Sequence, residues 1–461
     1  MFTGARDWLA FPSLSYLCSS GILNSVPSRV CDHGFMVREQ EDHGPRVVAG
    51  QPHGPAAAIT RRAADRLRAG HLWVYRSDVE SLVPPLGATE VAAGALVTVM
   101  DSRGIPLGTG LYSSASQIAV RIVATEAAVT RAAYLEQMQE RVVAALALRD
   151  EVAPESMEND ACRLIFSEAD GLPGIVADRY NDLVILQLLT QGTAQDDVRK
   201  ALIEVIRERF GDGVTIWERP DPKIRELEQL APPAPGPLHS SDHESPQLTT
   251  IFTINNLRFH FDAGSGQKTG AFLDQRLNYA AAARYAKGSA LDVCTYQGGF
   301  AIHLAQRCQQ VTGVDASRGA LEVADQNREL NPEFGAQVQW IEADAFELLR
   351  EYEAAGERYD TIVLDPPAFA KSKRAAEGAI RGYKELNLRA MKMLRPGGTL
   401  VTCSCSHHVP LQEFTEVVAA AASDAGQRVQ VLETRGAAPD HPAVLTLPET
   451  SYLKCLICRV G

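Results

Sequence analysis

From about residue 265 to residue 405, short apolar runs alternate with longer stretches whose hydrophobic positions recur at helical spacing. The apolar runs contain few polar side chains, which indicates strands that are buried on both faces. Such strands are typical of a parallel sheet with helices on both sides. The pattern therefore predicts a doubly wound α/β domain over residues 263–461. Its expected strands are 290–294, 311–315, 338–341, 361–364 and 399–405, and the helices between them are 299–308, 318–330, 345–352 and 382–394.

Two smaller domains are predicted before this one. Residues 55–125 hold short β-rich segments separated by proline and glycine turns, which is typical of a small β-barrel. Residues 126–262 combine helical and strand patterns in a mixed α/β domain, interrupted by a proline-rich excursion at 231–246. Residues 1–54 have no clear periodicity. We expect them to be an extension that is either disordered or the product of a start upstream of the natural one.

Composition narrows the setting of the protein. No apolar run approaches the roughly 18 to 20 residues that span a bilayer, so no membrane partner is expected. The 9 cysteines lack a disulfide-like spacing, which favours a reducing, cytoplasmic location. Cys455 and Cys458 lie three positions apart in a strand pattern, so they are expected on opposite faces as packing residues. No metal site is predicted.

The charge pattern leaves nucleic-acid binding open. The formal net charge is -12 at pH 7, but a local basic patch decides phosphate contact more than the average does. Two segments, 61–76 and 371–384, are basic against the acidic background. Each fits a solvated surface as well as an RNA contact. The candidate RNA-binding residues are Arg61, Arg66, Arg68, Lys371 and Lys373.

A candidate ligand site lies where the predicted parallel strands end, because their carboxyl ends share one edge of the sheet. Asp292 begins a turn through Gly298 and Gly299 that lacks the full G-x-G-x-x-G spacing. A cofactor without phosphates therefore fits this turn better than NAD. Asp315 ends the next strand, where a carboxylate can accept both hydroxyls of a ribose.

A third acid follows the third strand of the series. Asp344 precedes Ala345 and Phe346, which places an acceptor and an aromatic ring where an adenine would lie. Any one acid at a strand end can simply cap the helix that follows it. Three successive strands that end in acids at one edge are harder to explain as caps alone. We interpret the three acids as parts of one binding site.

Two further features belong to the same edge. Two prolines follow Asp365, and they fix a rigid extended turn that holds its carboxylate there. Cys403 and Cys405 alternate at the end of the last strand, with Cys405 nearer the ligand edge. A thiolate can add covalently to an electron-poor carbon, whereas buried cysteines are otherwise ordinary packing residues. We interpret Cys405 as the functional thiol and Cys403 as packing.

Together these motifs resemble the large-subunit ribosomal RNA methyltransferase I family, which makes 5-methylcytosine in 23S rRNA. The resemblance covers about residues 58–461 and implies a PUA-like barrel, a central mixed α/β domain and a class I S-adenosylmethionine (SAM) methyltransferase domain. The matching segments are Gln-Lys-Thr-Gly-Ala-Phe-Leu-Asp-Gln-Arg at 267–276, the glycine turn, 166–180, Asp-Pro-Pro-Ala-Phe at 365–369, Gly-Tyr-Lys-Glu-Leu-Asn at 382–387, Ser-Cys-Ser at 404–406 and Leu-Pro-Glu-Thr-Ser-Tyr-Leu-Lys at 447–454.

The resemblance also implies a reaction. Cys405 would add to C6 of cytosine as a thiolate, which turns C5 into a nucleophile for the methyl group of SAM. Asp365 would hydrogen-bond to the ring and balance charge as the adduct forms. The acceptor of the C5 proton is not assigned, and neither are His407 and His408. The implied partner is ribosomal RNA, with a homodimer left open. The implied cofactor-binding residues are Thr269, Phe272, Gln275, Arg276, Asp292, Thr295, Tyr296, Gly298, Asp315, Ser317, Asp344, Ala345 and Phe346.

Three other functions stay open. A guanine methyltransferase acting at N7 or N2 shares the Asp-Pro-Pro-x-Phe turn and needs no cysteine. A non-catalytic RNA-binding assembly factor would keep the fold and bind SAM without transferring its methyl group. A small-molecule methyltransferase would suit the acidic net charge but would not need the N-terminal barrel. Replacement of Cys405 by serine separates the guanine enzyme from C5 methylation.

Overall fold

The computed structural model describes residues 54–242, 244–264, 270–369 and 376–461. The expectation for the N-terminal extension and those for Thr269, Lys371 and Lys373 fall outside the described residues. The chain from residue 49 onward forms one compact unit. Its described strands form sheets of six, four, two and seven members. None of the described helices is long and apolar enough to cross a membrane.

The first sheet belongs to the small β domain. Its strands are β1 (Ala56–Ile59), β2 (Trp73–Tyr75), β3 (Val79–Val83), β4 (Leu96–Met100), β5 (Pro106–Tyr112) and β6 (Ile118–Ala124), in the order β2-β6-β5-β4-β1-β3. Helix α1 (Arg61–Arg68) begins after Thr60, whose side chain accepts a hydrogen bond from the N–H of Ala63. Branched side chains such as Val97 and Val120 fill the core between helix and sheet. The sequence pattern predicted short strands in this region but not α1.

The central sheet has four strands and two different faces. Its strands are β7 (Ala161–Phe166), β8 (Ile175–Tyr180), β9 (Leu183–Leu188) and β10 (Thr215–Glu218), in the order β10-β9-β8-β7. On one face, Ile175 and Val184 share a core with Met138 of α2 (Arg131–Val152) and Leu202 of α3 (Asp196–Phe210). The other face packs in part on the hairpin of β11 (Thr249–Ile254) and β12 (Leu257–Asp262). A short helix, α4 (Pro222–Glu228), follows β10.

The C-terminal sheet has seven strands. They are β13 (Ser289–Val293), β14 (Gln310–Asp315), β15 (Gln337–Glu342), β16 (Tyr359–Leu364), β17 (Leu394–Ser404), β18 (Val429–Arg435) and β19 (Lys454–Val460), in the order β15-β14-β13-β16-β17-β19-β18. Strands β13 to β17 pair in parallel, as the apolar runs predict. Strand β19 pairs antiparallel with both β17 and β18, an arrangement that the sequence pattern did not specify.

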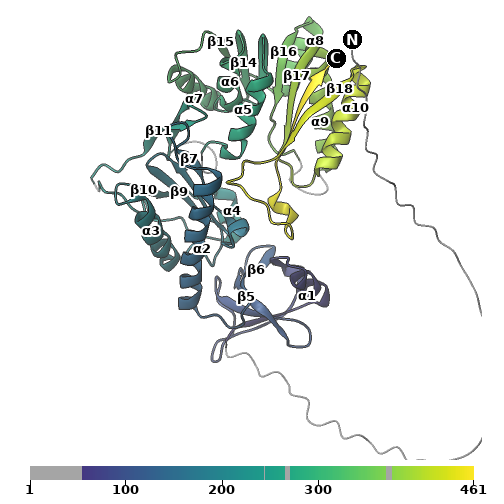
Figure 1. Ribbon diagram of the computed structural model, residues 1–461. Helices are drawn as coiled ribbons and strands as arrows, with labels where there is room; N and C mark the ends of the chain where they lie inside the picture. The colour runs from purple at the N-terminus through teal and green to yellow at the C-terminus, as the bar shows by residue number, and fades with distance from the viewer. Residues whose placement is uncertain (1–53, 243, 265–269, 370–375) are drawn as a thin grey trace, which may run out of the picture. The chain divides into compact units, whose positions relative to one another are not determined.

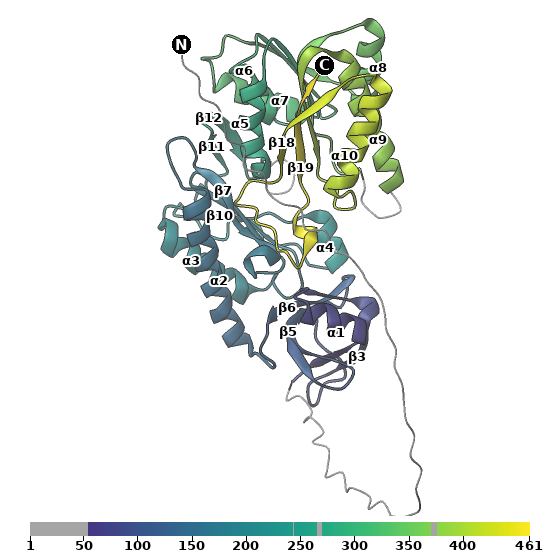
Figure 2. The ribbon, with the colours of Figure 1, turned by 45° about the vertical axis from the view of Figure 1, so that its right-hand side comes forward.

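Helices cover both faces of this sheet, which confirms the doubly wound α/β prediction. The helices are α5 (Arg276–Tyr285), α6 (Gly299–Ala305), α7 (Arg318–Glu329), α8 (Ala345–Ala355), α9 (Ala376–Met393) and α10 (Leu411–Ala425). Figures 1 and 2 show α5 and α6 on one side and α9 and α10 on the other. Cys455 of β19 belongs to the core on the first side and Cys458 to the core on the second. The expected placement of these two thiols on opposite faces is therefore confirmed.

A buried carboxylate ties the central domain to the C-terminal domain. Asp440 accepts hydrogen bonds from Arg276 Nη2 at 3.1 Å and from the backbone N–H of Arg163 at 3.0 Å. Its backbone carbonyl accepts from Arg149 Nη2 at 2.9 Å. Burial alone would raise the pKa of Asp440, but His441 and Arg276 together hold that pKa well below its ordinary value. The carboxylate is therefore charged at neutral pH and balances the buried guanidinium of Arg276.

Replacement of Asp440 by asparagine should destabilise the protein, because it leaves the Arg276 guanidinium buried without a counter-ion. Loss of one member of a buried ion pair costs about 3–5 kcal/mol. The matched control is Asp424→Asn, which removes a surface ion pair with Lys384 and should cost less than about 1 kcal/mol. Urea unfolding at pH 7 measures both changes. Equal small shifts for the two variants would contradict the role of Asp440.

Candidate functional site

A cavity of about 720 Å³ lies at the carboxyl edge of the C-terminal sheet. One part of its wall comes from the segments that follow β13 to β17. Further parts come from the segment before α5, from the central domain, from Trp73 of the small β domain and from the chain between β18 and β19. The lining residues that the argument uses are Trp73, Arg163, Phe166, Val176, Gln187, Phe272, Asp274, Gln275, Thr295, Tyr296, Asp315, Ser317, Asp344, Ala345, Phe346, Asp365, Pro366, Cys405, His407, His441, Glu449 and Tyr452.

Asp292 stabilises the glycine turn after β13 through hydrogen bonds. Its buried carboxylate accepts from Thr295 Oγ1 at 2.5 Å and from the backbone N–H of Ala301 at 2.9 Å. Burial raises the pKa of Asp292 to about 7. Cys294 and Tyr296 adopt φ values of 63° and 52°, which is uncommon for residues other than glycine and costs backbone energy. Asp292 therefore shapes the turn, while Thr295 and Tyr296 line the cavity.

The acid at the end of β14 is oriented by backbone donors. Asp315 accepts from the N–H of Tyr296 at 2.9 Å through one oxygen and from the N–H of Ser317 at 2.9 Å through the other. A carboxylate has about four acceptor positions, so two remain for a ligand in the cavity. The hydroxyl of Ser317 accepts from the N–H of Ala320 and caps α7. The structure therefore brings Asp315 and Ser317 together at one corner of the cavity.

The acid after β15 is a helix cap that also lines the cavity. Asp344 Oδ1 accepts from the N–H groups of Phe346 and Glu347 at the start of α8. The capping interpretation of this residue is therefore correct, and it does not exclude contact with a ligand. Ala345 and the ring of Phe346 lie next to it on the cavity wall. This apolar slot beside the Asp315 corner suits a flat heteroaromatic ring.

Gln275, in the segment directly before α5, contacts Asp365, which follows β16. Gln275 Nε2 donates to Asp365 Oδ2 at 2.9 Å. Burial, with the charges of Asp274 and Asp292, raises the pKa of Asp365 to about 8. The Asp365 carboxyl is therefore mostly protonated at neutral pH. Three of the expected cofactor residues that the structure describes do not line the cavity, namely Arg276, Asp292 and Gly298. Arg276 instead pairs with Asp440.

Cys405 lies one residue beyond β17, on the cavity wall. Its Sγ lies 4.0 Å from the carbonyl oxygen of Pro366, which follows Asp365 directly. Cys403, two residues earlier, is fully buried opposite Cys455, and burial holds the pKa of its thiol well above the ordinary value. The alternation along the strand thus separates an accessible thiol from a packed one.

A buried lysine beside Cys405 was not predicted from the sequence. Lys454 begins β19 opposite Ser404 and is only 6% exposed. Its Nζ donates to the backbone carbonyls of Ser406 and Tyr452, each at 2.7 Å. Burial lowers its pKa to about 8, and the nearby Cys405 acts in the opposite direction. The available signal was a lysine at the start of an otherwise apolar strand.

The basic residues of the small β domain have different surroundings. The side chain of Arg61 is 90% exposed. Arg66 pairs with the buried Asp78, and Arg68 Nη2 donates to the buried Asp101 at 2.6 Å. Two of the three candidate RNA contacts therefore also hold α1 in place. Among the described residues, no group of three or more His, Cys, Asp and Glu side chains is arranged to hold a metal ion.

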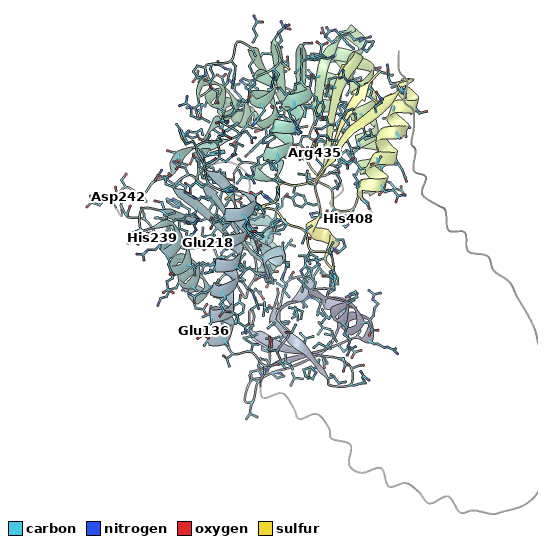
Figure 3. The ribbon with its side chains drawn as sticks, in the orientation of Figure 1. Glu136, Glu218, His239, Asp242, His408 and Arg435 are labelled. Atoms are coloured by element: carbon cyan, nitrogen blue, oxygen red, sulfur yellow. The ribbon has the colours of Figure 1, made fainter. Side chains whose placement is uncertain are left out.

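The two histidines after Cys405 lie on an exposed loop. His407 lines the cavity, whereas His408 does not, and Figure 3 labels His408 beyond the end of β17. The two rings therefore differ in their access to the site.

Comparisons with known proteins identify two regions of the chain. A family model described as S-adenosylmethionine-dependent methyltransferase matches residues 242–458. A second, described as PUA-like domain, matches residues 58–125. SAM is the cofactor of the C-terminal domain. The Asp315 corner and the slot beside Phe346 fit the ribose and the adenine of SAM.

Curated relatives match most of the chain. The "Ribosomal RNA large subunit methyltransferase I" of Klebsiella pneumoniae (strain 342) is 36% identical over 412 residues, which are 88% of this chain and 98% of the relative. The protein of the same name from Shewanella amazonensis is 40% identical over 395 residues, which are 85% of this chain and 95% of the relative.

A solved structure supports the fold. SMU.776, described as a methyltransferase complexed with SAH, superposes with a TM-score of 0.70 and covers 87% of this chain and 99% of its own. Its sequence identity is 17%, so the likeness extends to the fold alone.

Substitution of Asp315 by asparagine should weaken SAM binding by ten-fold or more. The change keeps the shape of the side chain but removes its charge and one acceptor, and a hydrogen bond to a charged group contributes about 1.5–3 kcal/mol. Isothermal calorimetry measures the affinity. The control is Asp325→Asn on α7, which does not line the cavity. Unchanged affinity in the Asp315 variant would place the ribose elsewhere.

Proposed function

Because this chain belongs to the ribosomal RNA large subunit methyltransferase I family, we propose that it forms 5-methylcytosine in 23S rRNA through a covalent adduct of Cys405. The curated relatives are named for ribosomal RNA of the large subunit, which supports the substrate. The observation that carries the chemistry is the thiol of Cys405 on the wall of the SAM cavity, close to the Asp365 turn. Methylation of a ready-made nitrogen nucleophile needs no thiol at this place.

The thiol answers a specific chemical difficulty. C5 of cytosine is a poor nucleophile, and SAM supplies the methyl group as an activated sulfonium substituent. Attack of the Cys405 thiolate on C6 forms an S–C6 bond and moves the electrons of the C5–C6 double bond toward the ring nitrogen, so that C5 gains enamine character. C5 then forms the new bond to the methyl carbon. Loss of the C5 proton and cleavage of the S–C6 bond restore the aromatic ring and release the thiolate.

Asp365 is suited to stabilise the adduct. Its raised pKa of about 8 keeps the carboxyl mostly protonated at neutral pH. A neutral acid can donate a hydrogen bond to N3, where negative charge develops when the thiolate adds to C6. Gln275 holds the other side of the same carboxyl through its contact with Oδ2. Asp365 therefore acts as the donor that receives the electron shift within the ring.

Lys454 is suited to stabilise the thiolate form of Cys405. Its ammonium is buried near Cys405, and no salt bridge joins it to a carboxylate in the described part of the chain. A positive charge near a thiol lowers the thiol pKa and raises the fraction of thiolate at neutral pH. Two backbone carbonyls fix the ammonium next to the end of β17. We assign Lys454 as a positioning residue that acts through Cys405.

The remaining expectations follow from the substrate. Ribosomal RNA is the proposed partner, with Arg61 as the most exposed of the candidate contacts in the small β domain. The cytoplasmic location is part of the same proposal. The comparisons give no support to a homodimer, and the proposal does not include one.

Replacement of Cys405 by serine should abolish formation of 5-methylcytosine, because a serine hydroxyl is a far weaker nucleophile than a thiolate. We expect the transfer rate to fall by at least about a thousand-fold, within the range that loss of a catalytic nucleophile causes. The assay follows labelled methyl transfer from SAM to an unmodified 23S transcript, with mass spectrometry of the product nucleoside. Cys162→Ser, outside the SAM cavity, is the control and should keep wild-type activity.

Two outcomes would decide against the covalent route. Transfer that survives in the Cys405 variant would favour a guanine methyltransferase, and mass spectrometry would then show a methylguanine. RNA that carries 5-fluorocytosine gives a second test: the fluorine on C5 cannot be removed as a proton is, so the adduct should persist as a denaturation-resistant complex. Absence of this complex would also contradict the covalent route. Unchanged 5-methylcytosine in the 23S rRNA of a deletion strain would refute the proposed function itself.

Lys454→Met should shift the pH dependence of methyl transfer. Without the ammonium, the pKa of the Cys405 thiol rises, so the acidic limb of the kcat profile moves to higher pH. Lys454→Arg, which keeps the positive charge, should restore part of the activity at neutral pH. Lys392→Met removes a surface ion pair with Glu353 and serves as the control. An unshifted profile with uniformly lower activity would indicate that Lys454 has a structural role alone.

A further inference from the structure

The central domain builds part of the cavity wall. Phe166 of β7 pairs with Val176 of β8, and Val176 pairs with Gln187 of β9. Residues directly opposite each other on neighbouring strands point to the same face. All three side chains line the cavity, on the sheet face that α2 and α3 leave free. This cross-strand row spans two strand spacings, roughly 10 Å.

Aromatic rings continue this wall toward Cys405. The ring of Phe166 lies 5.3 Å from that of His441 and 6.2 Å from that of Tyr452, between ring centres. The ring of Tyr452 lies 5.5 Å from that of His407, two residues after Cys405. All four rings line the cavity. They come from β7, from the loop after β17 and from the chain before β19, so folding alone brings them together.

Two of these rings are held in place by charged groups. The guanidinium of Arg163 lies 5.3 Å from the ring centre of Phe166 and donates two hydrogen bonds to the buried Asp178. The hydroxyl of Tyr452 donates to Asp274 at 2.5 Å. A fixed ring loses little freedom when a flat ligand stacks on it, so this wall is preorganised.

The row also contains a buried polar group that has no partner in the described part of the chain. Gln187 is 6% exposed, and its Nε2 has no hydrogen-bond acceptor there. It is the one polar residue of β9, Leu-Val-Ile-Leu-Gln-Leu, which is otherwise apolar and fully buried. A buried donor without an acceptor costs free energy in the free protein. Glu449 also lines the cavity, and its Oε2 is a buried acceptor that has no partner in the described part of the chain either.

We propose that this wall receives the extruded RNA nucleotide: its base stacks on the Phe166 and Tyr452 rings, and the Gln187 amide donates a hydrogen bond to an oxygen of that nucleotide. The inference rests on the proposed function and names the residues that would bind its RNA substrate. A base must leave its helix to reach the thiol in this cavity, and it then needs a surface on which to stack. The central domain thereby belongs to the active site and does more than connect its neighbours.

Gln187→Leu separates this role from a structural one. Removal of an unpartnered buried donor should leave the unfolding temperature unchanged or raise it, because leucine carries no polar group that needs a hydrogen-bond partner in these apolar surroundings. The affinity for SAM should stay within two-fold of wild type. The KM for an unmodified 23S transcript should rise ten-fold or more. Wild-type KM, or a loss of SAM affinity as large as the loss for RNA, would overturn the assignment.

Phe166→Leu tests the stacking surface in the same assays. It keeps an apolar side chain but removes the ring, and we expect a ten-fold or larger rise in the KM for RNA with SAM affinity unchanged. The matched control is Phe210→Leu at the end of α3, whose ring also lies near guanidinium groups but outside the cavity. Equal KM values in the two variants would refute the stacking surface.

Filter binding of the same transcript, without methyl transfer, keeps the inference distinct from the proposed function. Absence of transfer by the wild-type protein refutes the function. A ten-fold loss of RNA binding in Gln187→Leu would then still support the wall as an RNA site, whereas unchanged binding would refute it.

Discussion

Parallel pairing of β13 to β17 is the constraint on which the site depends. Parallel strands present all their carboxyl ends at one edge, so segments far apart in the sequence meet there. Asp315 ends β14, Asp365 and Cys405 directly follow β16 and β17, and all three line one cavity. The turn after β13, which lines this cavity, has left-handed backbone at Cys294 and Tyr296. The hydrogen bonds that Asp292 accepts hold that strained turn in place.

At neutral pH the protonation states of Asp365 and Lys454 both favour the thiolate form of Cys405. Burial and neighbouring acids keep Asp365 mostly protonated, and the buried Lys454 retains its proton up to about pH 8. The acid therefore adds little negative charge near Cys405, while the ammonium adds positive charge. Both effects favour a thiolate over a thiol. As the pH rises above 8, Asp365 or Lys454 loses its proton and the thiolate of Cys405 is stabilised less. The stabilisation of the thiolate and the hydrogen bond from Asp365 to the cytosine ring therefore depend on the same pH range.

Sequence periodicity was sufficient for the parallel sheet but not for the cavity wall. Strands buried on both faces leave an unambiguous apolar pattern, and acids at their ends are visible in the sequence. Phe166, Gln187 and Tyr452 face the same cavity from elements whose relative placement depends on tertiary contacts such as those of Asp440. No local pattern encodes that placement. Arg276 illustrates a second limit of the sequence, since its position in a recognisable segment suggested cofactor contact, whereas in the structure its charge pairs with the buried Asp440.

The antiparallel strand β19 explains how the second wall reaches the thiol. Strand β19 pairs antiparallel with β17 on one side and with β18 on the other. Strand β18 therefore runs in the same direction as β17 and the other parallel strands. The chain that leaves β18 therefore emerges at the carboxyl edge, and β19 must start from that edge to return. Residues 436–453 lie between these two points and carry Asp440, Glu449 and Tyr452. A parallel β19 would begin at the opposite edge and would place Lys454 far from Cys405. The direction of one strand thus supplies the domain contact, an aromatic ring of the wall and the ammonium beside the thiol.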